Sequence, residues 1–450
     1  MTIESIGIQR IPTDKRQGKP RSLFNLWFAA NLTIADFALG FFPLSMNMNF
    51  ASSIISIIVG NVLGAAIVGF SAMMGPRTGY PQMMGTTNSM GRLSMRIFGI
   101  INLSNTGGWF IVNNILSVSA LYLIFGTTYL LLIPVFVLIV YAVAYIGHNF
   151  IHRVERILSY VLGVLFLVVF LKVILSGGSS NLGAISHLSA SPPVIDTAFF
   201  GMIALSYSYL MSWGPYASDY SRYLPHNVSL RKVFSNTFAG AFISTTFVEV
   251  IAVIISFVTL STQSISSLKS ISGILYPLSL TAIALGGIAA NVLNLYSASL
   301  SGLVGGIRLR RTSFVGIVAI AGLALSLLFY VHFYAFFNDF LLVLDYWISP
   351  WVAILIIDFL VLRRQTLEFE KKINWRGIVA YSVGLLVSVP FMNIFFGNFN
   401  YTFFISRQLG GIDISYFVGF IVAAAVYYAS NLDRKRVPSA ISSEKVDAER

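Results

Sequence analysis

The sequence alternates between long apolar segments and short polar connections along almost its whole length. Each apolar segment has about 20 residues, enough for an α-helix to cross a hydrocarbon layer of about 30 Å. The pattern therefore predicts an all-α membrane protein with about twelve transmembrane helices. We expect them at residues 23–45, 50–72, 99–124, 128–147, 157–176, 197–215, 235–260, 275–304, 313–332, 338–362, 376–397 and 409–430.

The basic residues support this number of helices. When the connections are numbered from the amino terminus, all of the 29 Lys and Arg except Lys172, Lys269 and Arg407 fall on one side of the membrane. Lys and Arg accumulate in cytoplasmic loops, so the bias predicts a multi-pass protein of the plasma membrane with both termini in the cytoplasm. The net charge of +12 follows from this topology and does not indicate nucleic-acid binding.

The composition leaves room for a single folded unit in the bilayer. Hydrophobic residues make up 56% of the chain and charged residues 10%, with a mean hydropathy of +0.79. The longest connection, around 177–196, is too short for a second domain. We expect a cytoplasmic segment at 1–22, a transporter domain of twelve helices at 23–430 and a disordered cytoplasmic tail at 431–450. Cysteine is absent, which excludes disulfides and thiol catalysis.

Two predicted helices are interrupted near their centres. Polar residues and glycine break the first at residues 31–40, and Ser212-Trp213-Gly214-Pro215 stops the sixth. Such breaks are tolerated where the freed backbone groups face protein or a cavity. Because they lie five helices apart, they fit an inverted repeat with a transport site at the bilayer midplane. Ordinary glycine or proline kinks are the alternative.

An indole and a carboxamide lie four residues apart in the third predicted helix, at Trp109 and Asn113. At this spacing both side chains share one helix face. Trp109 is too deep for an interfacial anchor, and Gly108 beside it leaves room for a ligand. A stacking plane next to a two-sided hydrogen-bonding group suits a flat polar heterocycle such as a nucleobase.

Two further residues extend this candidate binding site. Trp213 lies at the break of the sixth helix, and Asn294 lies in the eighth. Two tryptophans would clamp both faces of a ring, while Asn113 and Asn294 would bind its edge. Helix packing through small and polar residues is the alternative for each of them.

Four ionisable residues are candidates for coupling or gating. Asp36 and Glu249 lie near the centres of the first and seventh helices, where ionisable groups are costly and usually functional. Either one would bind a coupling cation or carry a proton; a carboxyl group hydrogen-bonded within the bundle is the alternative. Asp219 and Arg222, three residues apart at a helix end, are expected to form a structural ion pair or a gate.

Other function classes lack their signatures. No phosphate-binding loop of the G-x-x-x-x-G-K type is present, which argues against an ATP-driven pump. A membrane enzyme would need a nucleophile or a metal cluster in the bundle, and no convincing one occurs. A channel would show a continuous polar lining, whereas the polar residues here converge at one depth. We expect no cofactor other than the coupling cation.

With these residues the chain resembles the nucleobase:cation symporter-1 family, and specifically its purine/cytosine permease branch. The resemblance covers nearly all twelve helices. It rests on residues 26–31 (LWFAAN), 75–82 (GPRTGYPQ), 108–113 (GWFIVN), 212–223 (SWGPYASDYSRY), 291–297 (NVLNLYS) and 346–351 (YWISPW), which occur in the family's order. It implies a LeuT-type five-plus-five inverted repeat with two extra C-terminal helices, and import of a nucleobase with a cation.

The resemblance also implies roles for single residues. In the family, aromatic residues on the third and sixth helices sandwich the ring, and polar residues on the third and eighth bind its edge. Trp109, Asn113 and Asn294 match these positions. Trp213 matches the sixth-helix aromatic, unless the break is registered earlier, around 207–210. Asparagine at 113 resembles purine and cytosine carriers, whereas uracil, allantoin and hydantoin carriers more often have glutamine.

One departure from the family concerns the cation. Sodium-coupled relatives place Ser or Thr hydroxyls about a turn and a half before the eighth-helix asparagine, where this chain has Ile288 and Ala289. Sodium needs oxygen ligands, so this departure favours protons, with Asp36 or Glu249 as carrier. We expect a proton-coupled importer of a purine or cytosine. The alternatives are sodium coupling or another heterocycle, such as hydroxymethylpyrimidine, uracil, allantoin or a hydantoin.

Overall fold

The computed structural model describes residues 3–176, 192–332, 346–396 and 399–432. Its elements in chain order are η1 (Thr13–Lys15), α1 (Arg21–Ala30), α2 (Ile34–Leu39), α3 (Phe42–Ser45), α4 (Phe50–Ala72), α5 (Met74–Thr78), η2 (Gln82–Gly85), α6 (Thr86–Met90), α7 (Arg92–Phe125), α8 (Tyr129–Ile146), α9 (His148–Ser176), α11 (Thr197–Met211), η3 (Gly214–Tyr216), α12 (Ser218–Ser221), α13 (Leu230–Thr259), α14 (Ser264–Ser272), η4 (Gly273–Leu275), α15 (Tyr276–Val304), α16 (Arg311–Phe329), η5 (Tyr330–His332), η6 (Ile357–Val361), α18 (Trp375–Ser388), η7 (Val389–Phe391), β1 (Asn393–Phe396), β2 (Phe399–Thr402), α19 (Phe404–Gln408) and α20 (Ser415–Ala429).

Each of the twelve predicted apolar segments contains a helix. Among the described residues, seven helices are long and apolar enough to span a membrane, and the bent pair α1 with α2–α3 makes an eighth. The sixth segment contains α11, and the last three contain shorter apolar helices, at Tyr346–Val361, α18 and α20. Residues 338–345 of the tenth predicted helix, most of the connection 177–196 and the tail 433–450 lie outside the described residues.

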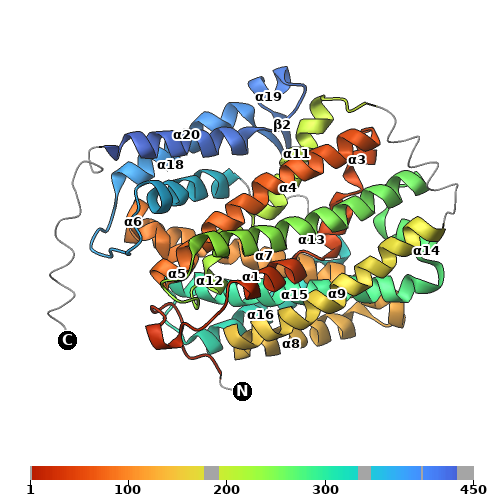
Figure 1. Cartoon of the computed structure of the whole chain (residues 1–450), viewed down its shortest axis with the longest axis horizontal. Coiled ribbons are helices and arrows are strands. Elements are labelled where there is room, and N and C mark those ends of the chain that lie inside the picture. Colours follow the sequence, from red (N-terminus) through yellow and green to blue (C-terminus); the bar gives the residue numbers. More distant parts are fainter. Residues whose placement is uncertain (1–2, 177–191, 333–345, 397–398, 433–450) are drawn as a thin grey trace.

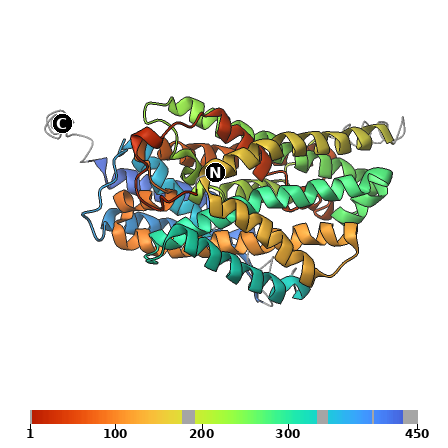
Figure 2. The same cartoon turned by 90° about the horizontal axis from the view of Figure 1, so that it is seen from below.

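The long helices lie side by side along the long axis of the molecule (Figures 1 and 2). α7 packs against α15, and α4 packs against both α11 and α13. Glycines permit the close approach of α4 to α11: a Cβ atom added at Gly60 would lie 2.6 Å from the carbonyl oxygen of Ile203. Small residues at helix interfaces serve this purpose in membrane proteins.

The eleventh predicted helix ends earlier than the sequence suggested. The prediction of helix to residue 397 is wrong beyond Phe391, because Pro390 lacks an N–H group and the chain then enters an antiparallel hairpin. Strands β1 and β2 form this hairpin, in which Asn393 pairs with Thr402. They are the strands of the one sheet found in the described residues. The twelfth helix, α20, begins at Ser415 rather than at residue 409.

Both predicted helix breaks are present. α1 ends at Ala30, and the chain resumes as α2 after a bend of 60°. The Thr33 side chain caps α2 by accepting a hydrogen bond from the backbone N–H of Asp36 (3.2 Å), which compensates for one freed backbone group. α11 ends at Met211, and a short 3-10 helix with Pro215 in its first turn follows. The breaks leave backbone polar groups at the centre of the bundle.

Candidate functional site

The predicted stacking residue, Trp109, lies buried on α7 opposite the broken helices. Its ring meets the ring of Tyr209 on α11, with centroids 6.0 Å apart and planes at 87°. The hydroxyl of Tyr209 in turn lies 3.1 Å from the hydroxyl of Thr33 at the break of the first helix. Side chains from three elements, α2, α7 and α11, therefore meet at the depth of the breaks.

Two aromatic residues near the sixth-helix break, Tyr209 and Trp213, pack against different rings. Trp213 packs its ring against Trp27 (centroids 5.4 Å apart) and against Tyr216 (5.4 Å), whereas Tyr209 packs its ring against Trp109. α11 remains helical up to Met211, so the residue that faces α7 comes one turn before Trp213. The contact with Trp109 thus lies at the earlier register, within 207–210, and the choice between Tyr209 and Trp213 as the residue that sandwiches the ring stays a prediction.

The amide of Asn113 has a defined orientation. Its Nδ2 donates to the backbone carbonyl of Trp109 (3.0 Å), one turn earlier on the same helix, and its buried Oδ1 has no hydrogen-bond partner among the described residues. Gly108 is buried beside Trp109, and a Cβ added at Gly107 would meet nothing within 4 Å. Asn113 therefore presents a free hydrogen-bond acceptor.

Asn31 repeats this arrangement at the break of the first helix. Its Nδ2 donates to the carbonyl of Trp27 (2.8 Å), and its fully buried Oδ1 has no partner in the described chain. A carbonyl can only accept, so the bond to it fixes which end of the amide is free. The sequence identified Asn31 as part of the break but not as a second acceptor.

Asn294 is engaged in a hydrogen-bond network within the protein. Its Oδ1 accepts from the Tyr216 hydroxyl (3.0 Å), and its Nδ2 donates to Asn291 Oδ1 (3.2 Å). Asn291 in turn donates to Asn114 on α7 (2.8 Å). In this conformation Asn294 links α15 to the stretch after the sixth-helix break.

Asp36 and Glu249 come from helices more than 200 residues apart in sequence, and their carboxyl groups face each other. Both side chains are fully buried. Neither oxygen of Asp36, nor Oε1 of Glu249, has a hydrogen-bond partner among the described residues. The three ion pairs found in the described chain include neither residue. The structure thus brings together two carboxyls that the sequence analysis treated as alternatives.

The surroundings of Glu249 hold the pair in place. One carboxyl oxygen accepts from Asn61 Nδ2 (2.7 Å) and from the Ser206 hydroxyl (3.4 Å). Gly40 allows the first broken helix to approach α13, because a Cβ there would lie 2.4 Å from the backbone oxygen of Glu249. Asn61 and Ser206 come from α4 and α11 and gave no signal of this role in the sequence.

α15 approaches the break of the first helix without a polar side chain. A Cβ added at Gly286 would lie 1.8 Å from the carbonyl oxygen of Leu32, and Gly287, Ile288 and Ala289 follow. These residues supply no side-chain oxygen. The part of α15 that lacks Ser or Thr hydroxyls is therefore the part that packs closely against the break of the first helix.

Replacing Gly286 by Ala is expected to destabilise the fold by about 1–3 kcal/mol, because the added methyl group must displace the backbone at Leu32. Thermal unfolding of the detergent-solubilised protein measures the change. Gly201→Ala on α11 is the matched control, since a Cβ there meets nothing within 4 Å. Equal melting temperatures for the two variants would contradict the proposed packing.

The ion pair expected between Asp219 and Arg222 is not formed. Asp219 instead accepts hydrogen bonds from the backbone N–H of Gln82 (2.9 Å) and from the Ser297 hydroxyl (2.7 Å). Arg222 pairs with Glu4 (3.4 Å) and donates to the backbone oxygen of Gly7 (2.8 Å). The spacing of three residues would allow Asp219 and Arg222 to pair, but each side chain instead bonds to residues distant in sequence.

These contacts close one end of the bundle, which we call the basic face. It is the end where α7, α9, α13 and α16 begin, with Arg92, Arg153, Arg231 and Arg311 near their first turns. Partial burial, and then the nearby guanidinium groups of Arg77, Arg16 and Arg10, lower the pKa of His226 in a loop of this face.

The stretch after the sixth-helix break is bonded to α15 along its whole length. Tyr216 reaches Asn294, and the Tyr220 hydroxyl donates to the carbonyl of Leu293 (2.6 Å) and lies 2.8 Å from the Ser297 hydroxyl. Arg222 donates to the hydroxyl of Tyr296 (3.1 Å). Direct hydrogen bonds therefore hold this stretch against α15 between the sixth-helix break and the basic face.

Known proteins resemble this chain over nearly its whole length. Residues 10–419 match the family model described as "Permease for cytosine/purines, uracil, thiamine, allantoin". The chain is 27% identical to YxlA of Bacillus subtilis, which is assigned as a purine-cytosine permease, over 95% of this chain and 96% of that protein. It is 26% identical to the purine-cytosine permease fcyB of Emericella nidulans, over 95% and 88% of the two chains.

A solved structure with a similar fold is that of Mhp1, a nucleobase-cation-symport-1 family transporter, in a closed conformation with bromovinylhydantoin bound. The TM-score is 0.77, with 18% identity over 96% of each chain. The inward-facing conformation of Mhp1 gives a TM-score of 0.69. This likeness confirms the predicted LeuT-type fold.

Proposed function

Because the chain belongs to the family of permeases for cytosine/purines, uracil, thiamine and allantoin, we propose that it is a secondary active importer that carries a nucleobase together with a proton. It is a permease and not an enzyme. The observation that carries the proposal is the meeting of an aromatic pair, free acceptors and a carboxyl pair at two helix breaks. Helix breaks at the midplane are where transporters of this architecture bind substrate and coupling ion.

The substrate proposal rests on Trp109 and on the free oxygens of Asn113 and Asn31. The indole offers a plane on which a base can stack, and such stacking does not discriminate between bases. The two amide oxygens accept but do not donate, since each amide nitrogen is bound to its own helix. A base rich in N–H groups, with an exocyclic amine, satisfies them best. We therefore favour adenine or cytosine over uracil or a hydantoin, which lack an exocyclic amine.

The coupling proposal rests on the carboxyl pair. Two facing carboxylates in a buried site repel each other strongly, because the low dielectric leaves their charges unscreened. A shared proton removes one charge and bridges the pair. Release of that proton changes the contact between the first broken helix and α13, so the proton and the conformation become linked. Asp36 and Glu249 are thus the proposed carriers.

Sodium is the less suitable cation for this chain. A sodium ion requires several oxygen ligands, and α15 supplies no side-chain oxygen at residues 286–290 beside the first-helix break. A proton requires only one acceptor, which Asp36 and Glu249 provide. We further propose that the basic face is the cytoplasmic face, in agreement with the distribution of Lys and Arg. The conformation described is then closed towards the cytoplasm.

Uptake by the purified protein in liposomes tests the function. Labelled adenine and cytosine are expected to accumulate, whereas hypoxanthine and uracil, which lack the exocyclic amine, enter about 5- to 150-fold more slowly, since a lost hydrogen bond to a buried acceptor costs about 1–3 kcal/mol. A protonophore is expected to abolish accumulation, and replacement of sodium by choline to leave it unchanged. Loss of accumulation without sodium would contradict the proton assignment, and failure of every base to enter would contradict the substrate class.

A further inference from the structure

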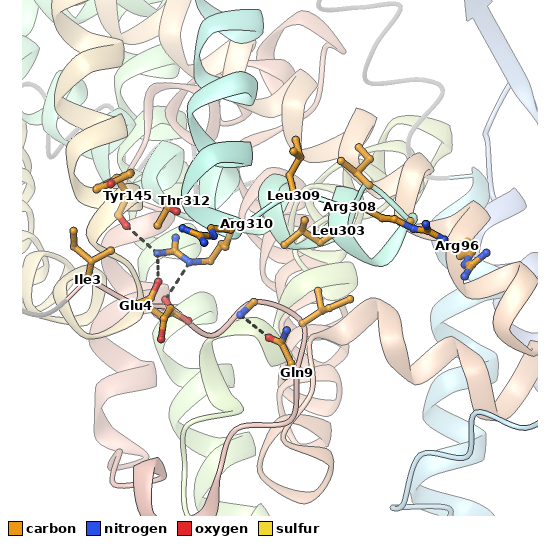
Figure 3. Close-up of a pocket in the computed structure, with 16 residues that line it drawn as sticks. Ile3, Glu4, Gln9, Arg96, Tyr145, Leu303, Arg308, Leu309, Arg310 and Thr312 are labelled. Carbon is orange, nitrogen blue, oxygen red and sulfur yellow. Dashed lines mark hydrogen bonds and ion pairs between the residues drawn. The ribbon is translucent and has the colours of Figure 1, made fainter.

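We propose that residues 3–9 form an amino-terminal latch that holds the transport pathway closed at the basic face, with Glu4 as its central residue. That this face is cytoplasmic rests on the proposed function; the latch itself rests on the contacts of Glu4. Figure 3 shows this segment, with Ile3, Glu4 and Gln9, beside Leu303, Arg310 and Thr312. The Glu4 carboxylate has bonding partners from several helix ends.

The carboxylate of Glu4 binds residues that follow the sixth-helix break and residues of α9, α15 and α16. One oxygen accepts from the hydroxyls of Tyr223 and Tyr296 (3.0 Å to Tyr296) and lies 3.4 Å from Arg222 Nη2. The other oxygen accepts from the backbone N–H of His148 (2.9 Å) and lies 3.8 Å from Arg311 Nε. Few side chains satisfy so many groups from separate helices.

The partners of Glu4 come from parts that must separate when the pathway opens. Arg222 and Tyr223 follow the broken sixth helix, whereas Tyr296 and Arg311 belong to α15 and α16. Alternating access moves the broken helices relative to the rest of the bundle. A contact between the broken sixth helix and α15 or α16 stabilises the closed arrangement. It must break before the open arrangement forms.

The charges make Glu4 difficult to replace. The side chains of Arg222 and Arg311 are 0% and 1% exposed, and Glu4 is the acid paired with each of them among the described residues. Without it, two buried guanidinium groups would remain without an anion while the pathway is closed. Leaving a buried charge unpaired is costly, so loss of Glu4 favours an open arrangement in which water reaches the arginines.

The backbone of the latch is anchored on both sides of Glu4. The N–H of Glu4 donates to the carbonyl of Ile146 (3.0 Å), and Arg311 Nη2 donates to the carbonyl of Glu4 (3.0 Å). Arg222 Nη1 donates to the carbonyl of Gly7 (2.8 Å). These bonds fix where the carboxylate enters the bundle.

The latch is not packed as tightly as the helices beneath it. Between residues 3–9 and the start of α16 lies a cavity of about 730 Å³, lined by Glu4, Gln9, Arg96, Arg308, Arg310 and Arg311 among others (Figure 3). Of the two isoleucines in the segment, Ile8 packs against the apolar core, whereas Ile3 is half exposed. The latch therefore depends on its polar bonds, and its release does not require unfolding of the bundle.

Cysteine labelling in the absence of substrate tests the latch. The chain has no cysteine, so Leu300→Cys alone provides a reporter. Leu300 is fully buried on α15, one helical turn beyond Tyr296 and on the same face. With Glu4→Gln added, a membrane-impermeant maleimide applied at the basic face is expected to label it about tenfold faster, since bonds to a charged group contribute about 1.5–3 kcal/mol.

Two controls make the outcome specific. Asp14→Asn removes an exposed acid from the same part of the chain and is expected to leave the labelling rate of Leu300→Cys unchanged. Val140→Cys, fully buried on α8, is expected to remain unreactive with Glu4→Gln, which excludes general unfolding. An unchanged rate at Leu300→Cys in the Glu4→Gln protein would overturn the latch.

The same experiment separates the latch from the proposed function. It requires no transported base and no proton gradient, so a wrong substrate or cation leaves the labelling result intact. Maleimide applied to the opposite face of the membrane gives a second test. Faster labelling from the extracellular side of intact cells would support the latch but contradict the proposed orientation.

Discussion

Replacement of Asp36 by Asn is expected to abolish proton-driven accumulation of the base. One proton per base supports about a hundred-fold accumulation in a gradient of about two pH units, since each unit is worth 1.36 kcal/mol, or a factor of ten. The variant keeps the volume of the side chain but cannot exchange a proton with Glu249. Its accumulation ratio should fall to about one, while exchange of labelled for unlabelled base across the membrane continues.

The measurement is the steady-state ratio of base inside and outside liposomes with an imposed pH gradient. Glu155→Gln is the matched control: Glu155 is a fully buried carboxyl on α9 whose oxygens bond to neither Asp36 nor Glu249 in the described chain. It should retain the parent ratio. Concentrative uptake by Asp36→Asn would refute the role of the carboxyl pair.

Replacement of Trp109 by Ala is expected to weaken binding of the base by about 5- to 150-fold, because stacking of a base on an aromatic side chain contributes about 1–3 kcal/mol. Trp109→Phe keeps a smaller plane and should recover part of the affinity. The ring contact with Tyr209 would also be lost in the alanine variant, which adds to the effect.

Isothermal titration or competition with a labelled base in detergent measures this affinity. Trp375→Ala is the matched control, since Trp375 begins α18 and its side chain is 66% exposed. It should bind the base as the parent does. If Trp109→Ala bound adenine and cytosine with unchanged affinity, the stacking site would lie elsewhere.

The sequence predicted the parts of the site that depend on local spacing. Trp109 and Asn113 share a face of α7 because residues four apart in a helix are neighbours, and the breaks at Asn31–Thr33 and after Met211 follow from the polar and helix-ending residues themselves. The role of Trp213 as the second aromatic stays a prediction, since α11 remains helical up to the break and it is Tyr209 that packs against Trp109 on α7.

The apolar segments, the alternation of basic connections and the two broken helices were determined by the sequence alone, since a span of about 20 residues and its flanking charges are local properties. Tertiary structure alone decided which charges meet. Asp36 lies against Glu249, Asp219 accepts from Ser297, and Arg222 pairs with Glu4, residues that are 78 to more than 200 positions apart. Contacts over such separations are set by how whole helices pack, which no short pattern along the chain encodes.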